Sequence, residues 1–75
     1  MTQHATITEN DCAVHVTVSD GRTASFPKGV RIEGVDYPED IEHTWRKFAL
    51  AQAGRWIAQY CPNVTSVDNI AGREG

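Results

Sequence analysis

The sequence has little of what builds a helical bundle, a membrane span or a nucleic-acid-binding surface. Leu50 is the only leucine, whereas valine and isoleucine together supply twelve residues, and this balance favours a core built on β-strands. No apolar run is long enough to cross a bilayer, and the first residues form no signal-peptide pattern. The net charge of −3 lacks the basic excess of typical nucleic-acid-binding proteins. We therefore expect a cytoplasmic protein that enters no membrane, and the charge disfavours direct binding to nucleic acid.

Metal-binding and catalytic patterns are also missing. Cys12 and His15 have one half of a zinc-site spacing, but His43 and Cys61 do not form a matching second half. The serines lie in no Gly-x-Ser-x-Gly elbow, and the chain has no glycine-rich phosphate loop. His43 follows Glu39 by one helical turn, but such pairs are frequent on solvated helices. We predict no metal site, no cofactor and no enzymatic activity, and we expect both cysteines to be buried, reduced thiols.

The length of 75 residues is enough for one domain, which we predict to span residues 1–75. A chain of this size buries only about 60% of its unfolded surface, so small domains often depend on a disulfide, a metal or a partner subunit for stability. Residues 71–75 are polar and rich in glycine, and we expect them to form a disordered tail.

The strongest local pattern predicts one long helix over residues 37–60. Asp36 suits the N-cap, Pro38 the first turn and Glu39 a capping box, while Cys61-Pro62 marks the end. Apolar residues between these signals recur at helical spacing. They are Ile41, Trp45, Phe48, Ala49, Ala53, Trp56, Ile57 and Tyr60.

Such a helix would be about 36 Å long, which is longer than a small sheet can cover. It is therefore expected either to overhang the sheet or to bend at Gly54, where glycine weakens a helix. Trp56, Ile57 and Tyr60 would extend past the sheet, and exposed aromatic residues often mark an interface. We predict self-association, as a homodimer, through these three residues.

The rest of the chain predicts short strands, and the fold class is α+β. A small antiparallel sheet of three strands, or of four, is expected to pack on the helix, in the chain order β-β-β-α with a weak final β. The predicted strands are residues 4–8, 12–18 and 22–27, then 30–33 as a fourth strand or an extension, and 64–70 as a weak edge strand.

The register of the first hairpin follows from its apolar pattern. A three-residue loop Ser19-Asp20-Gly21, with a left-handed glycine, keeps all the valines of the hairpin on the inner face. This loop pairs Val18 with Arg22, Val16 with Ala24 and Val14 with Phe26. We expect this face to pack on Trp45 and Phe48, so that Trp45→Ala would cost roughly 3–5 kcal/mol and unfold the domain.

Charge is distributed unevenly along the chain. Five acids and no base occur between residues 33 and 42, namely Glu33, Asp36, Glu39, Asp40 and Glu42. The helix dipole explains carboxylates near a first turn, but it leaves Glu33 and Glu42 without a structural role. In the opposite sense, Arg22, Lys28 and Arg31 occur in a stretch without acids.

Two functions are compatible with these patterns. In the first, the chain is a non-enzymatic protein-binding module whose five acids occupy a basic surface of a partner, in the manner of a phage-type, anti-CRISPR-like inhibitor of a host nucleic-acid machine. No motif carries that general likeness. In the alternative, a sheet-plus-helix domain reads DNA through its strands. The contacts would then come from Arg22, Thr23, Ser25, Lys28 and Arg31.

Overall fold

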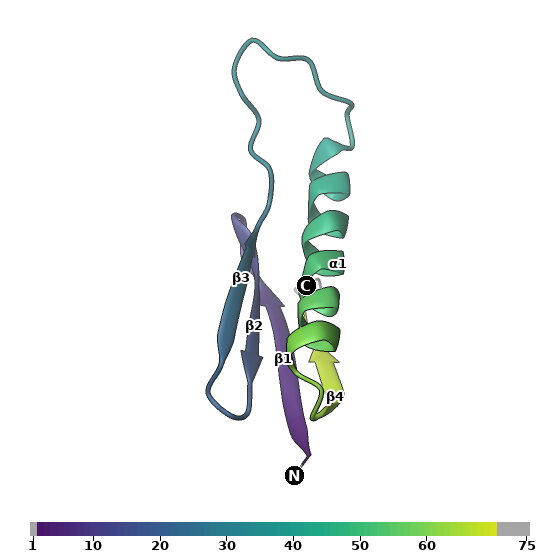
Figure 1. Ribbon diagram of the computed structural model, residues 1–75. Helices are drawn as coiled ribbons and strands as arrows, with labels where there is room; N and C mark the ends of the chain where they lie inside the picture. Colours follow the sequence, from purple (N-terminus) through teal and green to yellow (C-terminus); the bar gives the residue numbers. More distant parts are fainter. Residues whose placement is uncertain (1, 71–75) are drawn as a thin grey trace.

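The computed structural model describes residues 2–70, which form a four-stranded sheet with one helix packed on one face (Figure 1). The elements in chain order are β1 (Gln3–Glu9), β2 (Ala13–Val18), β3 (Thr23–Pro27), α1 (Ile41–Tyr60) and β4 (Val64–Asn69). The prediction of an α+β fold with one helix is therefore confirmed. The expected tail at 71–75 lies outside the described residues.

The sheet is mixed and not wholly antiparallel. Its spatial order is β3-β2-β1-β4, in which β1, β2 and β3 pair antiparallel and β4 pairs parallel with β1. The parallel pairing arises because α1 returns the chain to the end of the sheet where β1 starts, so that β4 runs beside β1 in the same direction (Figure 1). The prediction of an antiparallel sheet is thus correct for three strands and wrong for the last one.

The predicted register of the β2–β3 hairpin is confirmed. Val14 lies opposite Phe26 and Val16 opposite Ala24. The Val18 amide donates to the Arg22 carbonyl at 2.8 Å, and Gly21 closes the loop with a φ of 102°. A positive φ is accessible to glycine without strain, which explains the residue at this turn.

The core lies between the inner face of the sheet and a stripe of small residues on α1. Its buried members are Ala5, Ile7, Val14, Val16, Val18, Ala49, Ala53, Ile57 and Cys61. Alanine at positions 49 and 53 lets the helix lie close to the valines. The prediction that Phe48 faces these valines is wrong, because Phe48 is 64% exposed. Trp45 also lies outside this cluster and is half-buried.

The helix begins later than predicted, at Ile41. Asp36 is not its cap: the residue before the helix is Asp40, whose side chain makes no capping hydrogen bond. Residues 37–40 are held in the preceding loop because Tyr37 packs on Trp45 and its hydroxyl accepts a hydrogen bond from the Ile32 amide. The strand predicted at 30–33 does not form either, since no strand within residues 2–70 pairs with it.

The helix runs without interruption past Gly54, which is exposed and has open space around it. Its 20 residues correspond to about 30 Å. The overhang lies at the N-terminal end of α1 and not at the predicted C-terminal end (Figure 1). Within residues 2–70, no helix combines the length and the apolar character needed to cross a membrane.

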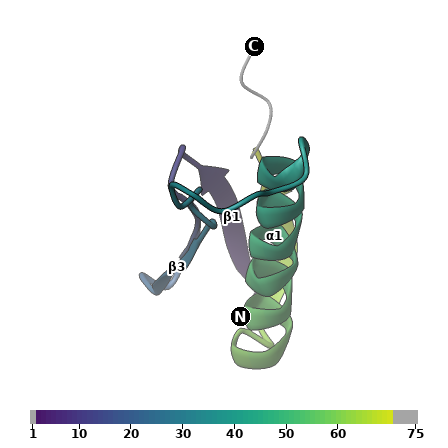
Figure 2. The ribbon, with the colours of Figure 1, turned by 90° about the horizontal axis from the view of Figure 1, so that it is seen from above.

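The overhanging end gives the molecule an elongated shape. Its extents are 50 × 27 × 16 Å and its radius of gyration is 13.9 Å. A compact chain of this length would have a radius of gyration of about 11 Å. The excess comes from the connection between β3 and α1, which crosses from the sheet to the helix beyond the end of the sheet (Figures 1 and 2).

Candidate functional site

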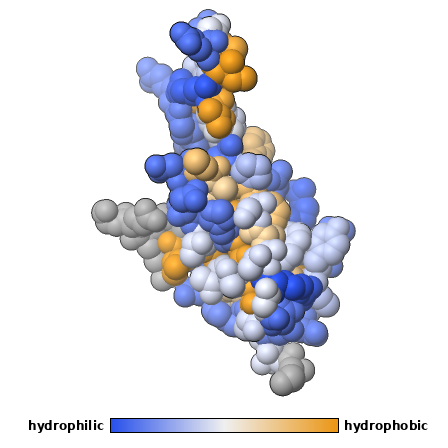
Figure 3. Space-filling model, turned by 90° about the vertical axis from the view of Figure 1, so that its left-hand side faces the viewer, coloured by the Kyte–Doolittle hydropathy of each residue, from blue (hydrophilic) through white to orange (hydrophobic). Residues whose placement is uncertain are grey.

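Three strongly exposed apolar side chains lie close together in the sequence on the connection between β3 and α1, residues 28–40, which we call the arch. Val30 is 75% exposed, Ile32 64% and Val35 51%. In Figure 3 the arch forms the projecting top of the molecule and carries hydrophobic and hydrophilic surface side by side. Clustered apolar side chains on a projecting loop are unfavourable in water unless a partner covers them.

The inner side of the arch is fastened to the helix by Arg31. Its guanidinium forms a two-point ion pair with Glu42, in which Nη2 donates to Oε1 at 2.9 Å and Nε contacts Oε2. The same guanidinium lies over the Tyr37 ring, 5.8 Å from its centroid. This pairing holds the pKa of the Glu42 carboxyl below its usual value, chiefly through the hydrogen bond from Arg31. The two neighbours of Arg31, Val30 and Ile32, are largely exposed to solvent.

An aromatic contact completes the attachment. The rings of Tyr37 and Trp45 meet edge to face, with centroids 5.4 Å apart and an interplanar angle of 73°. Gly29 lies against the Trp45 indole, so closely that a Cβ added at this position would overlap the ring. Between Gly29 and Tyr37 the arch makes a tight turn, in which the Val35 amide donates to the Ile32 carbonyl at 3.2 Å and Gly34 adopts a φ of 88°. The arch is thus held by side chains and one tight turn, without a sheet.

A cluster around Glu9 ties the start of the arch to the sheet and the helix. The Glu9 carboxylate accepts from Lys28 Nζ at 2.8 Å and from Arg46 Nε at 3.0 Å. Lys28 also donates to the Asn10 carbonyl at 2.8 Å. The Glu9 side chain is only 10% exposed, and the pKa of its carboxyl is lowered, first by the hydrogen bond from Lys28 and further by that from Arg46.

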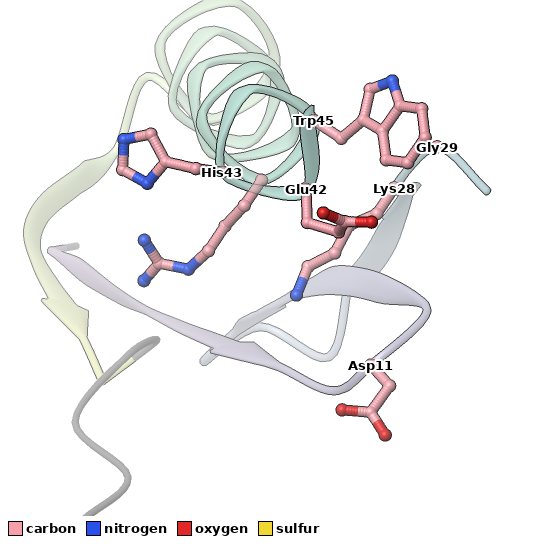
Figure 4. A pocket seen from close by; sticks show the side chains of 7 residues that line it. Asp11, Lys28, Gly29, Glu42, His43 and Trp45 are labelled. Carbon is pink, nitrogen blue, oxygen red and sulfur yellow. The ribbon is translucent and has the colours of Figure 1, made fainter. Parts of the chain in front are cut away.

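A pocket of about 320 Å³ opens below the arch. It is lined by Asp11, Lys28, Gly29, Glu42, His43, Trp45 and Arg46 (Figure 4). Two of the lining residues, Lys28 and Arg46, already donate to Glu9, and the lining residue Glu42 pairs with Arg31. The charges around the pocket are therefore largely compensated within the chain. Among residues 2–70 no group of three His, Cys, Asp or Glu side chains is placed to hold a metal ion.

Of the five acids predicted to bind a partner, four lie on the arch. Glu33, Asp36, Glu39 and Asp40 are exposed and form no ion pair with any residue between 2 and 70. Glu42 differs, because its pairing with Arg31 gives it a structural role that the sequence did not reveal. The acidic part of the candidate site is therefore the arch itself.

The basic residues predicted to contact DNA are each bonded to a carboxylate of the same chain. Arg22 pairs with Asp20 at 2.7 Å and also donates to the Tyr60 carbonyl at 2.7 Å. Lys28 pairs with Glu9 and Arg31 with Glu42. Thr23 and Ser25 lie on the exposed face of β3, and the Ser25 hydroxyl is 2.9 Å from His15 Nδ1. The sheet therefore presents no group of unpaired cations from these three positions.

The residues predicted for self-association have different surroundings. Ile57 is only 6% exposed and belongs to the core. Trp56 is half-buried beside Phe26, with ring centroids 6.4 Å apart, whereas Tyr60 is 55% exposed. The expectation that all three extend past the sheet is wrong, because the sheet covers this end of the helix. Self-association itself stays a prediction.

The two cysteines are free thiols in unlike settings. Cys61 is buried at the end of α1, as expected, but Cys12 is exposed in the turn between β1 and β2. Cys12 escapes burial because its amide donates to the Asn10 side chain in a tight turn that turns the residue outward.

Sequence reasoning missed the exposure of Val30, Ile32 and Val35 and the central place of Glu9. The alternation of residues 30–33 was the available signal, but alternation alone cannot show whether a neighbouring strand exists.

Comparisons with protein-family models, curated proteins and solved structures gave no match to this chain. The geometry of the arch must therefore support any functional proposal.

Because Trp45 holds the arch and not the core, Trp45→Ala is expected to destabilise the fold by only about 1–2 kcal/mol. The Ile32 amide, which donates to Tyr37, should exchange with solvent at least about tenfold faster in this variant, since its acceptor would lose its support. Hydrogen exchange followed by NMR measures both effects. Phe48→Ala, on the outer side of the same helix, is the control and should leave the Ile32 exchange rate unchanged. Loss of protection across the whole sheet in Trp45→Ala would contradict this assignment.

Proposed function

We propose that this chain is a non-enzymatic protein-binding module that engages its partner through the arch. The observation that carries the proposal is the exposure of Val30, Ile32 and Val35 on a projecting, well-anchored loop. Burying three such side chains at an interface is favourable by roughly 1.5–3 kcal/mol each. Apolar anchors with a polar rim are the usual composition of a protein interface.

The acids of the arch support a partner with a basic surface. Glu33, Asp36, Glu39 and Asp40 are exposed on the same segment as the apolar side chains and form no ion pair within residues 2–70. Complementary charge mainly raises the rate of association and excludes wrong partners. A partner that fits this surface would offer an apolar depression with lysine or arginine at its margin.

The anchoring of the arch supports binding without a large ordering cost. The contacts of Arg31 with Glu42 and of Tyr37 with Trp45 attach the loop to α1 in the absence of a partner. A loop that is already ordered loses less conformational entropy on binding. This supports recognition by a preformed surface over folding on contact.

A more specific form of the proposal is inhibition. A row of carboxylates on a projecting loop resembles a run of phosphates in charge, so the basic surface of the partner would be one that otherwise holds DNA or RNA. On this proposal the protein acts as a phage-type, anti-CRISPR-like inhibitor, and it would displace nucleic acid from its partner in proportion to arch binding. Direct DNA binding is the less favoured alternative, because Arg22, Lys28 and Arg31 are engaged in ion pairs.

The test places a photo-crosslinking amino acid at Val30 and, as a control, at Thr17, an exposed residue of β2. Irradiation in a lysate of the source cells should give a crosslinked protein from position 30 and not from position 17. An excess of unlabelled protein should suppress the crosslink, whereas an excess of the Val30→Ser, Ile32→Ser double variant should not. Equal crosslinking from both positions, or equal competition by both proteins, would show that the arch is not the binding surface.

The role of the acids is tested with the partner identified in this way. Glu33→Gln with Asp36→Asn raises the net charge by two and should slow association by about tenfold at low salt. Thr17→Lys with Thr65→Lys, at exposed positions away from the arch, changes the net charge by the same amount and should have a much smaller effect. Stopped-flow kinetics between about 0.05 and 0.5 M salt measure both. If the two variants associate equally slowly, net charge and not the arch governs the encounter.

A further inference from the structure

The outer edge of β3 is an open strand edge. β3 is the first strand in the order β3-β2-β1-β4, so among residues 2–70 only the side of β3 that faces β2 is paired. Toward β2, the Arg22 carbonyl accepts from Val18 and the Lys28 amide donates to Cys12, both at 2.8 Å. Main-chain groups of an antiparallel strand point to alternate sides, so those of Thr23, Ser25 and Pro27 point away from the sheet.

This edge lacks most devices that prevent strand pairing. Such edges are usually protected by charged side chains, bulges or proline. The residues of β3 are Thr23, Ala24, Ser25, Phe26 and Pro27, none of which is charged. Pro27 removes one outward amide, but the amides of Thr23 and Ser25 and all three outward carbonyls remain available. In Figure 3, which views the molecule from the β3 side, weakly polar and hydrophobic surface extends over the middle of the lower body.

The edge is complementary to itself. If two copies meet antiparallel with Ser25 opposite Ser25, each Ser25 amide donates to the Ser25 carbonyl of the other copy. Each Thr23 amide then donates to the Pro27 carbonyl of the other copy, and the proline needs only to accept. In the same register Phe26 lies opposite Ala24, so a large side chain meets a small one.

The side chains beside this edge fit the same arrangement. Phe26, Trp56 and Tyr60 form a row, with centroids 6.4 Å apart for each neighbouring pair, and Tyr60 is 55% exposed. At the ends of the paired segment Arg22 would face Lys28, but each carries its own carboxylate partner. The arches would project from opposite ends of the pair, which leaves them free.

We propose that this protein forms a two-fold symmetric dimer through antiparallel pairing of β3 with β3 of a second copy, centred on Ser25. The pairing joins two four-stranded sheets into one continuous sheet with both helices on the same face. The dimer is independent of the arch and of the partner proposed for it.

The first test is sedimentation equilibrium of the full chain from about 1 µM to about 1 mM, a range that covers dissociation constants typical of modest interfaces. A reversible monomer–dimer equilibrium is expected. Ser25→Pro removes an outward amide without removing a bond to β2, and it should weaken the dimer at least tenfold. Val67→Pro is the matched control on the other edge strand, β4, where the Val67 amide also points outward, since the Ile70 amide donates to Ile7 of β1. It should leave dimerisation unchanged. A monomer at every concentration, or a dimer sensitive only to Val67→Pro, would overturn the proposal.

The second test needs no substitution and so does not depend on how a proline variant folds. Amide hydrogen exchange is measured in the unmodified protein at high and low concentration. The amides of Thr23 and Ser25 should be protected at high concentration and exchange fast at low concentration, whereas the Val67 amide should exchange fast in both. Concentration-independent exchange at Thr23 and Ser25 would contradict pairing at this edge.

Discussion

Replacing Ile57 with alanine is expected to lower the free energy of unfolding by about 3 kcal/mol, because it leaves a cavity where the helix meets the sheet. Ile57 is 6% exposed and belongs to the cluster formed by the valines of β2 and the alanines of α1. A domain of this length has a free energy of unfolding of about 4–11 kcal/mol, so the variant would lose a large fraction of its stability. Urea unfolding followed by circular dichroism measures the change.

Phe48→Ala is the matched control on the same helix. Phe48 is larger than Ile57 but is 64% exposed, so its removal should change the free energy of unfolding by no more than about 0.5 kcal/mol. If Phe48→Ala proves as costly as Ile57→Ala, the helix is rotated about its axis from the orientation described above.

Glu9→Gln is expected to cost about 3 kcal/mol at neutral pH, because it leaves Lys28 and Arg46 without their shared carboxylate. All three side chains are largely or partly withdrawn from solvent, at 10% exposure for Glu9, 14% for Lys28 and 33% for Arg46. The arch begins at Lys28, so faster amide exchange there should accompany the loss. Thermal unfolding together with hydrogen exchange measures both.

The same carboxylate predicts how stability depends on pH. The pKa of Glu9 is lower in the folded protein than its ordinary value of 4.5, chiefly through the hydrogen bond from Lys28. The unfolded chain therefore binds more protons, and the contribution of Glu9 is complete above about pH 4.5 and is lost as pH falls through the folded pKa. The pKa values of Asp20 and Glu42 are lowered too, so both proteins should lose stability on acidification. Only the unmodified protein has the added contribution of Glu9, so its loss should be steeper than that of Glu9→Gln. Identical pH profiles would contradict this role for Glu9.

Local patterns in the sequence were enough to predict the hairpin and the existence of the helix. The valine alternation and the position of Gly21 determined the register of β2 on β3, since a slip by one residue would turn every valine to the solvent. The helical spacing from Ile41 to Tyr60 likewise predicted one helix, and its stripe included Ala49, Ala53 and Ile57. Both depend on neighbours along the chain, which a sequence displays directly.

Long-range contacts decided what local patterns could not. Whether residues 30–33 become a strand depends on a neighbouring strand. None in the described part of the chain pairs with them, and Val30 and Ile32 are exposed. Whether Glu42 is a surplus charge depends on Arg31, eleven residues earlier, which meets it only because the arch folds back on the helix. The start of α1 at Ile41 follows from the contact of Tyr37 with Trp45. The sequence by itself thus determined the hairpin, the helix and the apolar face of the sheet, because these follow from periodicity. Only the tertiary structure decided which apolar and acidic residues stay exposed on the arch, because the exposure of a side chain depends on whether a distant part of the chain packs on it or pairs with it.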